Sequence, residues 1–360
     1  MLQKGTILYI GGFELPDKNA AAQRVIGIAK CLRDLGYRVV FINALKSGRD
    51  FEKKEYFGFE TLEYKREGEI DYLFTGKTML SYIKENRPKA VIAYNYPAIP
   101  LNKIRKYCQS KQIKCIADAT EWSKPVGGNI IYKIIKEFDT AYRMRYVQKH
   151  IDIVIAISRY LNDYYRNCVQ TIYIPPLVDI NDEKWQVEVQ QDTEVTTFVY
   201  AGSPSAVKEK LDLLVAAIDR ISTSAHVCLN IVGITEAQFR NIYNWQGDIC
   251  SAVNFLGRIE HKKAVEMVKQ AKWSVILRDN NRVVKAGFPT KFVESISCGT
   301  PVIANSFSNV DEYIESVGLM INDFVEIDKV LLDACYSDKV VDNEMFDYRK
   351  YTPKLSEVLL

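Results

Sequence analysis

The sequence predicts an α/β protein of two domains, each built around a parallel sheet with helices on both faces. Its 360 residues exceed the usual size of one domain and fit two domains of roughly 150 to 200 residues. Segments with strand and helix periodicity alternate along nearly the whole chain, which is the pattern of parallel sheets covered by helices. The composition, with 48% hydrophobic and 26% charged residues, is that of a globular protein and excludes disordered and fibrous classes.

The first series of elements forms an N-terminal domain over residues 1–180. It begins with an apolar strand over 6–10, a Gly11-Gly12 turn, and an amphipathic helix from Ala20 to Leu35 that Gly36 ends. We predict further strands at 38–42, 90–94, 114–117 and 153–157, and helices near 77–86, 99–110, 130–149 and 159–166.

A polar, acid-rich stretch at 181–195 has no clear period and is predicted to be a linker. The second series follows it and forms a Rossmann-like domain over 196–335, with a C-terminal helical segment at 336–360 for which we consider packing on the N-terminal domain. We predict strands at 197–201, 227–232, 253–256, 274–277 and 301–304, and helices starting near 208, 236, 262 and 291, with late helices at 327–335 and from 338 onward.

Cysteine usage and hydropathy indicate a soluble, cytoplasmic protein. The eight cysteines are scattered without a CxxC pair, as expected for reduced thiols. The N-terminal apolar stretch is too short for a signal peptide, and no apolar run approaches the ~20 residues needed to cross a bilayer. Residues 1–180 contain 29 Lys and Arg against 19 Asp and Glu. This basic half suggests an anionic partner, and charge alone leaves nucleic acid, a membrane surface and a phosphorylated lipid open.

Two such domains would place the carboxyl ends of their strands on either side of an interdomain cleft, the usual ligand position for open α/β sheets. Gly11 and Gly12 lie between a strand and a helix, so their backbone N–H groups can approach an anion, although a tight turn explains them equally well. A dinucleotide fingerprint needs a third glycine and an acidic residue at the end of the second strand. The sequence has Phe13-Glu14 after the two glycines and Asn43 at the strand end. Nicotinamide chemistry is therefore disfavoured.

The second domain offers two groups suited to a diphosphate-bearing ligand. Gly202 follows the first strand, and we expect a helix to start at Lys208, whose amine can neutralise phosphate charge. Further along, Lys285 to Ile303 contains a glycine turn, a helix that carries Glu294, then Gly-Thr-Pro and a strand. The N-terminus of this helix and the Glu294 carboxylate can meet one ligand.

This segment resembles the signature of the retaining GT-B glycosyltransferases of group 1, family four, and SCGTPVIAN closely matches its end. Matching positions extend over both domains and include the Pro175–Asp179 run. The resemblance implies a GT-B fold, with Glu294 on the ribose hydroxyls of a nucleotide sugar and Lys208 on its diphosphate. The donor site that it implies consists of Gly202, Ser203, Lys208, Gly233, Gly257, Arg258, Ile259, Arg278, Lys285, Gly287, Phe288, Pro289, Thr290, Lys291 and Glu294.

Two positions depart from the family pattern. Ser203 replaces an arginine, and Ala286 replaces the first of two glutamates that lie eight positions apart. Lys208, with Lys285, Lys291 or Arg278, must then carry more of the diphosphate charge. The variant sequence GFPTKFVES is similar to a branch of bacterial polysaccharide transferases. The departures are therefore interpreted as a subgroup trait, with loss of activity as the competing interpretation.

From this resemblance we expect a sugar to pass from a nucleoside-diphosphate sugar, UDP-sugars being favoured, to a glycan or polyprenyl-diphosphate-linked acceptor. The product would belong to bacterial capsule, exopolysaccharide or cell-wall glycan synthesis. No metal or other cofactor is expected, because the sequence has no DxD pair and only three histidines, and no nucleic-acid partner is expected. A degenerate GT-B subunit that stabilises another transferase and a sugar-nucleotide epimerase are the alternatives.

On the acceptor side, Asp118 and Glu121 follow a buried strand and are candidates to orient the acceptor or the sugar, with a capping or loop role as the alternative. Gly11, Gly12, Asn19 and Arg24 are further acceptor-binding candidates. The segment from Ile130 to Val147 mixes apolar, aromatic and basic residues. Such a helix either lies on an anionic membrane or covers the sheet, and the second interpretation is slightly favoured.

Overall fold

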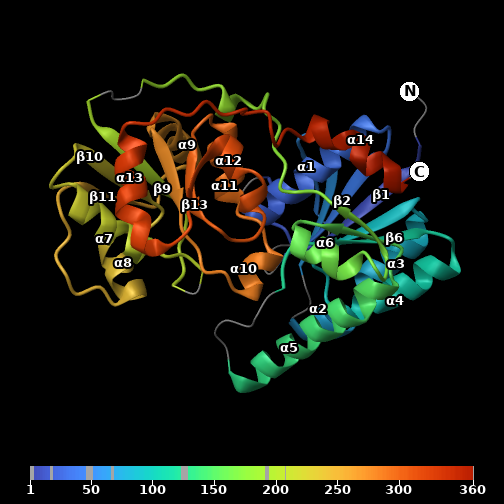
Figure 1. The fold of residues 1–360 in the computed structure, drawn as a ribbon. Coiled ribbons are helices and arrows are strands. Elements are labelled where there is room, and N and C mark those ends of the chain that lie inside the picture. The colour runs from blue at the N-terminus through green and yellow to red at the C-terminus, as the bar shows by residue number, and fades with distance from the viewer. Residues whose placement is uncertain are drawn as a thin grey trace. The chain divides into compact units, whose positions relative to one another are not determined.

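The computed structural model describes residues 4–16, 19–45, 52–65, 69–122, 129–190, 194–206 and 208–359. The chain divides into two compact units (Figure 1). Unit 1 comprises Met1–Leu177, Ala286–Phe288 and Tyr348–Leu360, and unit 2 comprises Val178–Lys285 and Pro289–Asp347.

Unit 1 contains an eight-stranded sheet in the order β3-β4-β2-β1-β5-β6-β7-β8. All neighbouring strands are parallel except β3 and β4, which form an antiparallel hairpin at the edge. The strands predicted from periodicity are confirmed, whereas β3, β4 and β8 were not predicted. The strands are β1 (Thr6–Gly11), β2 (Arg38–Leu45), β3 (Glu52–Tyr56), β4 (Phe59–Lys65), β5 (Ala90–Tyr94), β6 (Lys114–Ala119), β7 (Ile153–Ala156) and β8 (Gln170–Tyr173).

Helices cover this sheet, and the last helix of the chain belongs to the same unit. The Sγ of Cys31 in α1 donates a hydrogen bond to the carbonyl oxygen of Tyr348, at the start of α14, over 3.3 Å. The buried Leu355 of α14 shares a core with α1. The helices are α1 (Ala20–Asp34), α2 (Glu69–Phe74), α3 (Lys77–Asn86), α4 (Ala98–Ser110), α5 (Ile130–Arg145), α6 (Arg159–Tyr165) and α14 (Tyr348–Leu359), with a 3₁₀ helix at Val147–His150.

Unit 2 contains a six-stranded sheet in the order β11-β10-β9-β12-β13-β14, with every pair parallel. Its strands are β9 (Thr196–Ala201), β10 (Val227–Val232), β11 (Val253–Gly257), β12 (Trp273–Ile276), β13 (Val302–Asn305) and β14 (Gly318–Ile321). Its helices are α7 (Leu211–Ile221), α8 (Glu236–Tyr243), α9 (His261–Gln270), α10 (Arg282–Ala286), α11 (Thr290–Ser297), α12 (Ile314–Val317) and α13 (Ile327–Cys335), with 3₁₀ helices at Glu183–Trp185, Val310–Glu312 and Phe324–Glu326.

The stretch expected to be a linker is partly fixed to unit 2. Trp185 is buried and packs in one cluster with Val199 of β9 and Val265 of α9. The Lys269 Nζ donates hydrogen bonds to the carbonyl oxygens of Trp185 and Val187, over 2.7 and 2.8 Å. Unit 2 therefore begins before the predicted boundary, and residues 191–193 of the stretch lie outside the described part of the chain.

Within the described ranges, no helix is both long enough and apolar enough to cross a bilayer.

Candidate functional site

The carboxyl ends of β9 and β12 form a topological switch point in unit 2. From β9 the sheet extends to β10 on one side and to β12 on the other, and open α/β sheets bind ligands where the strand order reverses. Three predicted glycines gather at this edge, because Gly202 and Gly233 directly follow β9 and β10, and Gly257 is the last residue of β11. The Gly202 N–H donates to the carbonyl oxygen of Val232, and the Gly233 N–H donates to that of Gly257, both over 2.8 Å.

Glycine is required where these strand ends approach one another. Gly233 has a φ of +116°, and a Cβ there would lie 2.2 Å from the Gly202 carbonyl oxygen. Gly202 has a φ of +141°, and a Cβ there would lie 2.7 Å from the Cε of Lys291. The missing side chain at Gly202 therefore leaves room for the Lys291 side chain against the end of β9.

Two cations and one carboxylate meet at the switch point. Glu209, in the turn after β9, accepts hydrogen bonds at Oε1 from Arg278 Nη2 over 2.8 Å and from Lys291 Nζ over 3.3 Å. Its Oε2 accepts from the Ser205 N–H over 3.0 Å, and Lys291 also donates to the Tyr200 hydroxyl. The two cationic side chains outnumber the single carboxylate, so the cluster carries excess positive charge and attracts an anion.

Burial shapes the ionisation of this cluster. The side chains of Glu209, Arg278 and Lys291 are only 4%, 12% and 13% exposed. Burial lowers the pKa of Lys291 to about 8, although the Glu209 carboxylate opposes the shift. Burial alone would raise the pKa of Glu209, but the charges of Lys291 and Arg278 outweigh it and hold the pKa below its ordinary value.

The backbone around Arg278 fixes its guanidinium at this edge. Arg278 follows β12, and its N–H donates to Oδ1 of Asn305 while the Asn305 Nδ2 donates to the Arg278 carbonyl oxygen, each over 2.8 Å. The guanidinium lies 5.7 Å from the centre of the Phe307 ring. Among the described residues, nothing hydrogen-bonds to its Nε. A cation that is held in place in this way suits recognition of an oxyanion.

The structure corrects the prediction that a helix starts at Lys208. α7 begins at Leu211, and Lys208 lies in the preceding turn with an exposed side chain. The Lys208 N–H donates to the Ser205 carbonyl oxygen, and the Lys208 carbonyl oxygen accepts from the Asp279 N–H, both over 3.0 Å. The backbone of Lys208 thus lies beside the residue after Arg278, while its amine, like the side chain of Ser203, faces solvent.

In unit 1 the corresponding switch point lies at the end of β1, between β2 and β5. Two predicted acceptor residues lie there, although Gly11 is the last residue of β1 and only Gly12 follows the strand. Asn19 caps α1, because its Oδ1 accepts a hydrogen bond from the Ala22 N–H over 2.9 Å.

Arg24 and Asp118 form a buried ion pair in unit 1. Arg24 Nη2 lies 2.9 Å from Asp118 Oδ1, and the side chains are 2% and 0% exposed. The Tyr9 hydroxyl donates to Asp118 Oδ2 over 2.5 Å, and Arg24 Nη1 donates to the carbonyl oxygens of Ile174 and Pro175 over 2.6 and 2.7 Å. The pair joins α1 to β6 and to the segment after β8.

This geometry corrects the expectation that both acids follow the strand. Asp118 lies within β6, and contact with a substrate would require breaking its pair with Arg24. Glu121 follows the strand and its side chain is exposed. Of the two predicted acids, only Glu121 is therefore open to solvent.

Asn95 and Thr120 were not predicted, yet they lie at the carboxyl ends of β5 and β6. Asn95 Nδ2 donates to Thr120 Oγ1 over 2.6 Å, and the Thr120 N–H donates to Asn95 Oδ1 over 3.2 Å. Arg143 Nη1 donates to the Asn95 carbonyl oxygen over 2.8 Å. Their position directly after two predicted strands was the signal that could have found them.

Comparison with known families concerns mainly the second unit. Residues 195–332 match the family model described as glycosyl transferases group 1. This segment is therefore similar to the group 1 glycosyltransferases. A comparison with curated protein sequences gives no match.

Solved structures resemble the chain over nearly its whole length. Sucrose-phosphate synthase from Thermosynechococcus elongatus is 15% identical, with a TM-score of 0.69 and 98% of each chain covered. Anabaena HepE in complex with UDP-glucose is 15% identical, with a TM-score of 0.67 and 99% of each chain covered. The lipopolysaccharide outer core galactosyltransferase WaaB is 14% identical, with a TM-score of 0.66, covering 98% of this chain and 99% of that one. The chain therefore has the GT-B fold of two Rossmann-like domains.

Unit 2 holds most of the predicted signature. Lys291 and Glu294 lie one turn apart on α11, and Glu294 Oε1 lies 3.6 Å from His261 Nε2. Pro289 precedes α11, and Thr290 is its first residue. Three further predicted donor-site residues differ in exposure. Arg258 is exposed, Lys285 in α10 is half-buried, and Ile259 packs against the cluster that contains Trp185.

Part of the predicted signature belongs to unit 1. Gly287 and Phe288 belong to the segment Ala286–Phe288 of that unit. There the buried Ser158 Oγ donates a hydrogen bond to the Ala286 carbonyl oxygen over 2.9 Å. Position 286 thus contributes a backbone contact in this chain.

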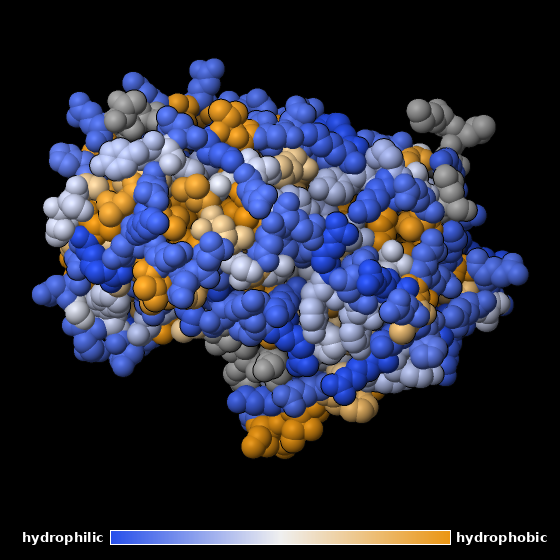
Figure 2. Space-filling model, in the orientation of Figure 1, coloured by the Kyte–Doolittle hydropathy of each residue, from blue (hydrophilic) through white to orange (hydrophobic). Residues whose placement is uncertain are grey.

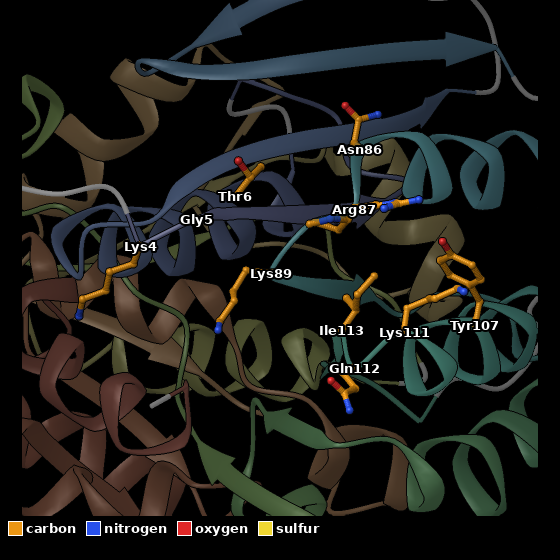
Figure 3. A pocket seen from close by; sticks show the side chains of 11 residues that line it. Lys4, Gly5, Thr6, Asn86, Arg87, Lys89, Tyr107, Lys111, Gln112 and Ile113 are labelled. Carbon is orange, nitrogen blue, oxygen red and sulfur yellow. The ribbon is translucent and has the colours of Figure 1, made fainter.

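A basic hollow of about 530 Å³ lies at the amino ends of β1, β5 and β6 (Figure 3). Lys4, Arg87, Lys89 and Lys111 line it, and it includes none of the predicted site residues. Gly11 and Gly12 lie at the opposite, carboxyl end of β1. The hollow is therefore separate from the predicted acceptor residues.

In the described ranges, no group of three or more His, Cys, Asp and Glu side chains is arranged to hold a metal ion. Independence from metals stays a prediction.

Proposed function

We propose that the chain is a retaining glycosyltransferase that transfers a sugar from a nucleoside-diphosphate sugar to a glycan or polyprenyl-diphosphate-linked acceptor. The observation that supports this most is the meeting of Lys291 and Arg278 at the switch point of a segment similar to the group 1 glycosyltransferases. A diphosphate needs fixed positive charge at the carboxyl ends of the strands, and this cluster supplies it. UDP-sugars are the favoured donors, in line with the UDP-glucose bound to HepE.

In this proposal, the bond between the anomeric carbon and the phosphate oxygen breaks while the acceptor hydroxyl attacks from the same face of the sugar. Negative charge develops on the departing nucleoside diphosphate, which takes up the hydroxyl proton. Lys291 and Arg278 stabilise that charge, because Glu209 and Asn305 already hold them in place before the reaction. No reorganisation of these groups is then needed in the transition state.

The same cluster accounts for one of the two departures from the family pattern, the missing arginine at Ser203. Ser203 supplies no charge, but Lys291 and Arg278 together provide two cations where the pattern usually has an arginine after the first glycine. The exposed Lys208 adds a third cation that can reach the diphosphate. Because these charges are protein groups, the transfer proceeds without a metal ion or other cofactor.

The remaining roles follow the order of elements in each unit. Glu294 holds the ribose, one turn along α11 from Lys291. Gly202, Gly233 and Gly257 allow the donor to approach the strand ends. On the acceptor side, Gly12 and Glu121 contact the acceptor, while Arg24 and Asp118 position the elements around it. We assign the acceptor to bacterial capsule, exopolysaccharide or cell-wall glycan synthesis on the inner face of the membrane, on the strength of the GFPTKFVES sequence and the basic first unit.

The test is incubation of the purified chain with UDP-, GDP- and ADP-sugars, followed by measurement of free nucleoside diphosphate. We expect slow release of nucleoside diphosphate from one donor, with the released sugar keeping its anomeric configuration. Conversion of the donor to an isomeric nucleotide sugar without release indicates an epimerase instead. Binding of every donor without turnover, in the presence of a polyprenyl-diphosphate-sugar, indicates a degenerate subunit.

A further inference from the structure

The first half of α5 turns large apolar side chains to solvent. Ile130, Ile131, Ile134 and Phe138 are 75%, 64%, 62% and 60% exposed. Ile130, Ile134 and Phe138 follow at intervals of four residues and share one face of the helix, with Ile131 beside them. Figure 2 shows this apolar patch at the lower edge of the molecule, over the start of α5. Contiguous apolar surface of this kind marks a binding surface.

The patch is built on a fixed helix. Asn129 caps the start of α5, with its Oδ1 accepting a hydrogen bond from the Tyr132 N–H over 2.9 Å. Further along, Asp139 Oδ1 accepts from the Ala98 N–H over 2.7 Å, and Met144 is fully buried. A helix that merely covered the sheet would turn its apolar face inward, whereas α5 buries Thr140, Arg143 and Met144 near its end and exposes the apolar side chains before them.

Positive charge accompanies the apolar face. Lys133 and Arg145 are exposed, and Lys136 lies with its Nζ 6.0 Å from the Tyr132 ring centre. Residues 129–146 carry four Lys and Arg against two Asp and Glu, and of these six Arg143 is buried, while Asp139 is bonded to the Ala98 N–H. A second copy of the same face would bring like charges together, which costs free energy. An anionic lipid surface would attract these charges.

We infer that Ile130, Ile131, Ile134 and Phe138 of α5 form a membrane-docking surface, which inserts between the headgroups of an anionic bilayer. An amphipathic helix with basic flanks lies in this way at the boundary between headgroups and acyl chains. The inference deepens the proposed function, since a polyprenyl-linked acceptor is held in the bilayer. Only the identity of the acceptor rests on the proposed function; the docking of α5 on a membrane does not depend on it.

The test is flotation of the full chain with vesicles made of equal parts phosphatidylglycerol and phosphatidylcholine, and with vesicles of phosphatidylcholine alone. We expect the wild type to float with the anionic vesicles and less with the neutral ones. The double variant Ile131→Ser/Ile134→Ser should lower the partition coefficient at least about tenfold, because two apolar contacts with the bilayer are lost. Val325→Ser is the matched control, because Val325 is 88% exposed and lies in unit 2; it should float like the wild type.

A charge variant tests the preference for anionic lipid. Lys133→Gln/Lys136→Gln should weaken binding to anionic vesicles by about fivefold for each charge removed, with little change for neutral vesicles. Three results would overturn the inference: no flotation of the wild type with anionic vesicles, equal flotation of the serine variant, or a wild-type dimer that the serine variant makes monomeric. Donor turnover measured without vesicles separates the two proposals. The serine variant should keep the wild-type rate, and an inactive wild type that still floats contradicts only the proposed function.

Discussion

At the scale of single residues, the main feature of the candidate site is one carboxylate that pairs with two cations. Glu209 is 4% exposed and holds both Arg278 and Lys291. Removing its charge would leave two buried cations unpaired, which explains why an acid belongs at a site that must attract an anion. Burial lowers the pKa of Lys291 to about 8 even beside this carboxylate, so the charge of Lys291 depends on pH near neutrality.

This dependence gives a prediction for the donor reaction. The protonated Lys291 binds the diphosphate, so kcat/KM for the donor should fall as pH rises through about 8. In Lys291→Arg the alkaline fall should disappear, because a guanidinium stays charged throughout this range. The measurement is the pH profile of kcat/KM for both proteins. A fall that persists unchanged in the arginine variant would assign the ionisation to another group, such as the nucleotide base.

At the scale of elements, the Arg24–Asp118 pair joins α1 to β6 and to the end of β8 in the core of unit 1. Asp118→Ala should lower the free energy of unfolding by about 3 to 5 kcal/mol, since it leaves the Arg24 charge buried without a partner. Urea denaturation checks the value. The control is Asp163→Ala, which breaks an exposed pair with Arg166 and should cost less than about 1 kcal/mol. Equal effects of the two variants would contradict the structural role of the buried pair.

Element boundaries were predictable where apolar periodicity is strong. The predicted ranges of β5, β10 and α13 agree with the structure at both ends. β3 was missed because its sequence, EKKEY, is charged and mostly exposed at the sheet edge. β8 and β14 were missed because each has only four residues and is partly exposed, whereas β7, β12 and β13, which are equally short, are buried at every position.

The site could be predicted only in part, for a physical reason. Periodicity and turn residues report local structure, and they indicated the glycines at the strand ends and the α11 segment with Lys291 and Glu294. The partners of Glu209 lie 69 and 82 residues away along the chain. The partner of Arg24 lies 94 residues away. Such pairs depend on the order of strands in the sheet, which cannot be read from a single sequence. Asp118 was therefore predicted to be an accessible acid.

At the scale of the whole molecule, the chain leaves unit 1 after Leu177, returns to it at Ala286–Phe288 and returns again with α14. Leu355 of α14 is fully buried in the core that α1 shares. Leu355→Ala should therefore destabilise the protein by about 2 to 5 kcal/mol, although only five residues follow it in the sequence. Chemical denaturation measures the effect, with Val340→Ala as a control because Val340 is 94% exposed. A Leu355→Ala protein as stable as the control would show that α14 is dispensable.

The most direct test of the account is the initial rate of nucleoside diphosphate release by Lys291→Met, compared with the wild type and with Lys329→Met. Lys329 is an exposed lysine of α13 in the same unit, so its variant controls for the loss of a lysine. We predict that Lys291→Met lowers the rate at least about 100-fold, the scale of one lost transition-state donor, while its circular dichroism and Lys329→Met turnover match the wild type. A folded Lys291→Met protein with the wild-type rate would contradict the claim that this amine meets the departing diphosphate.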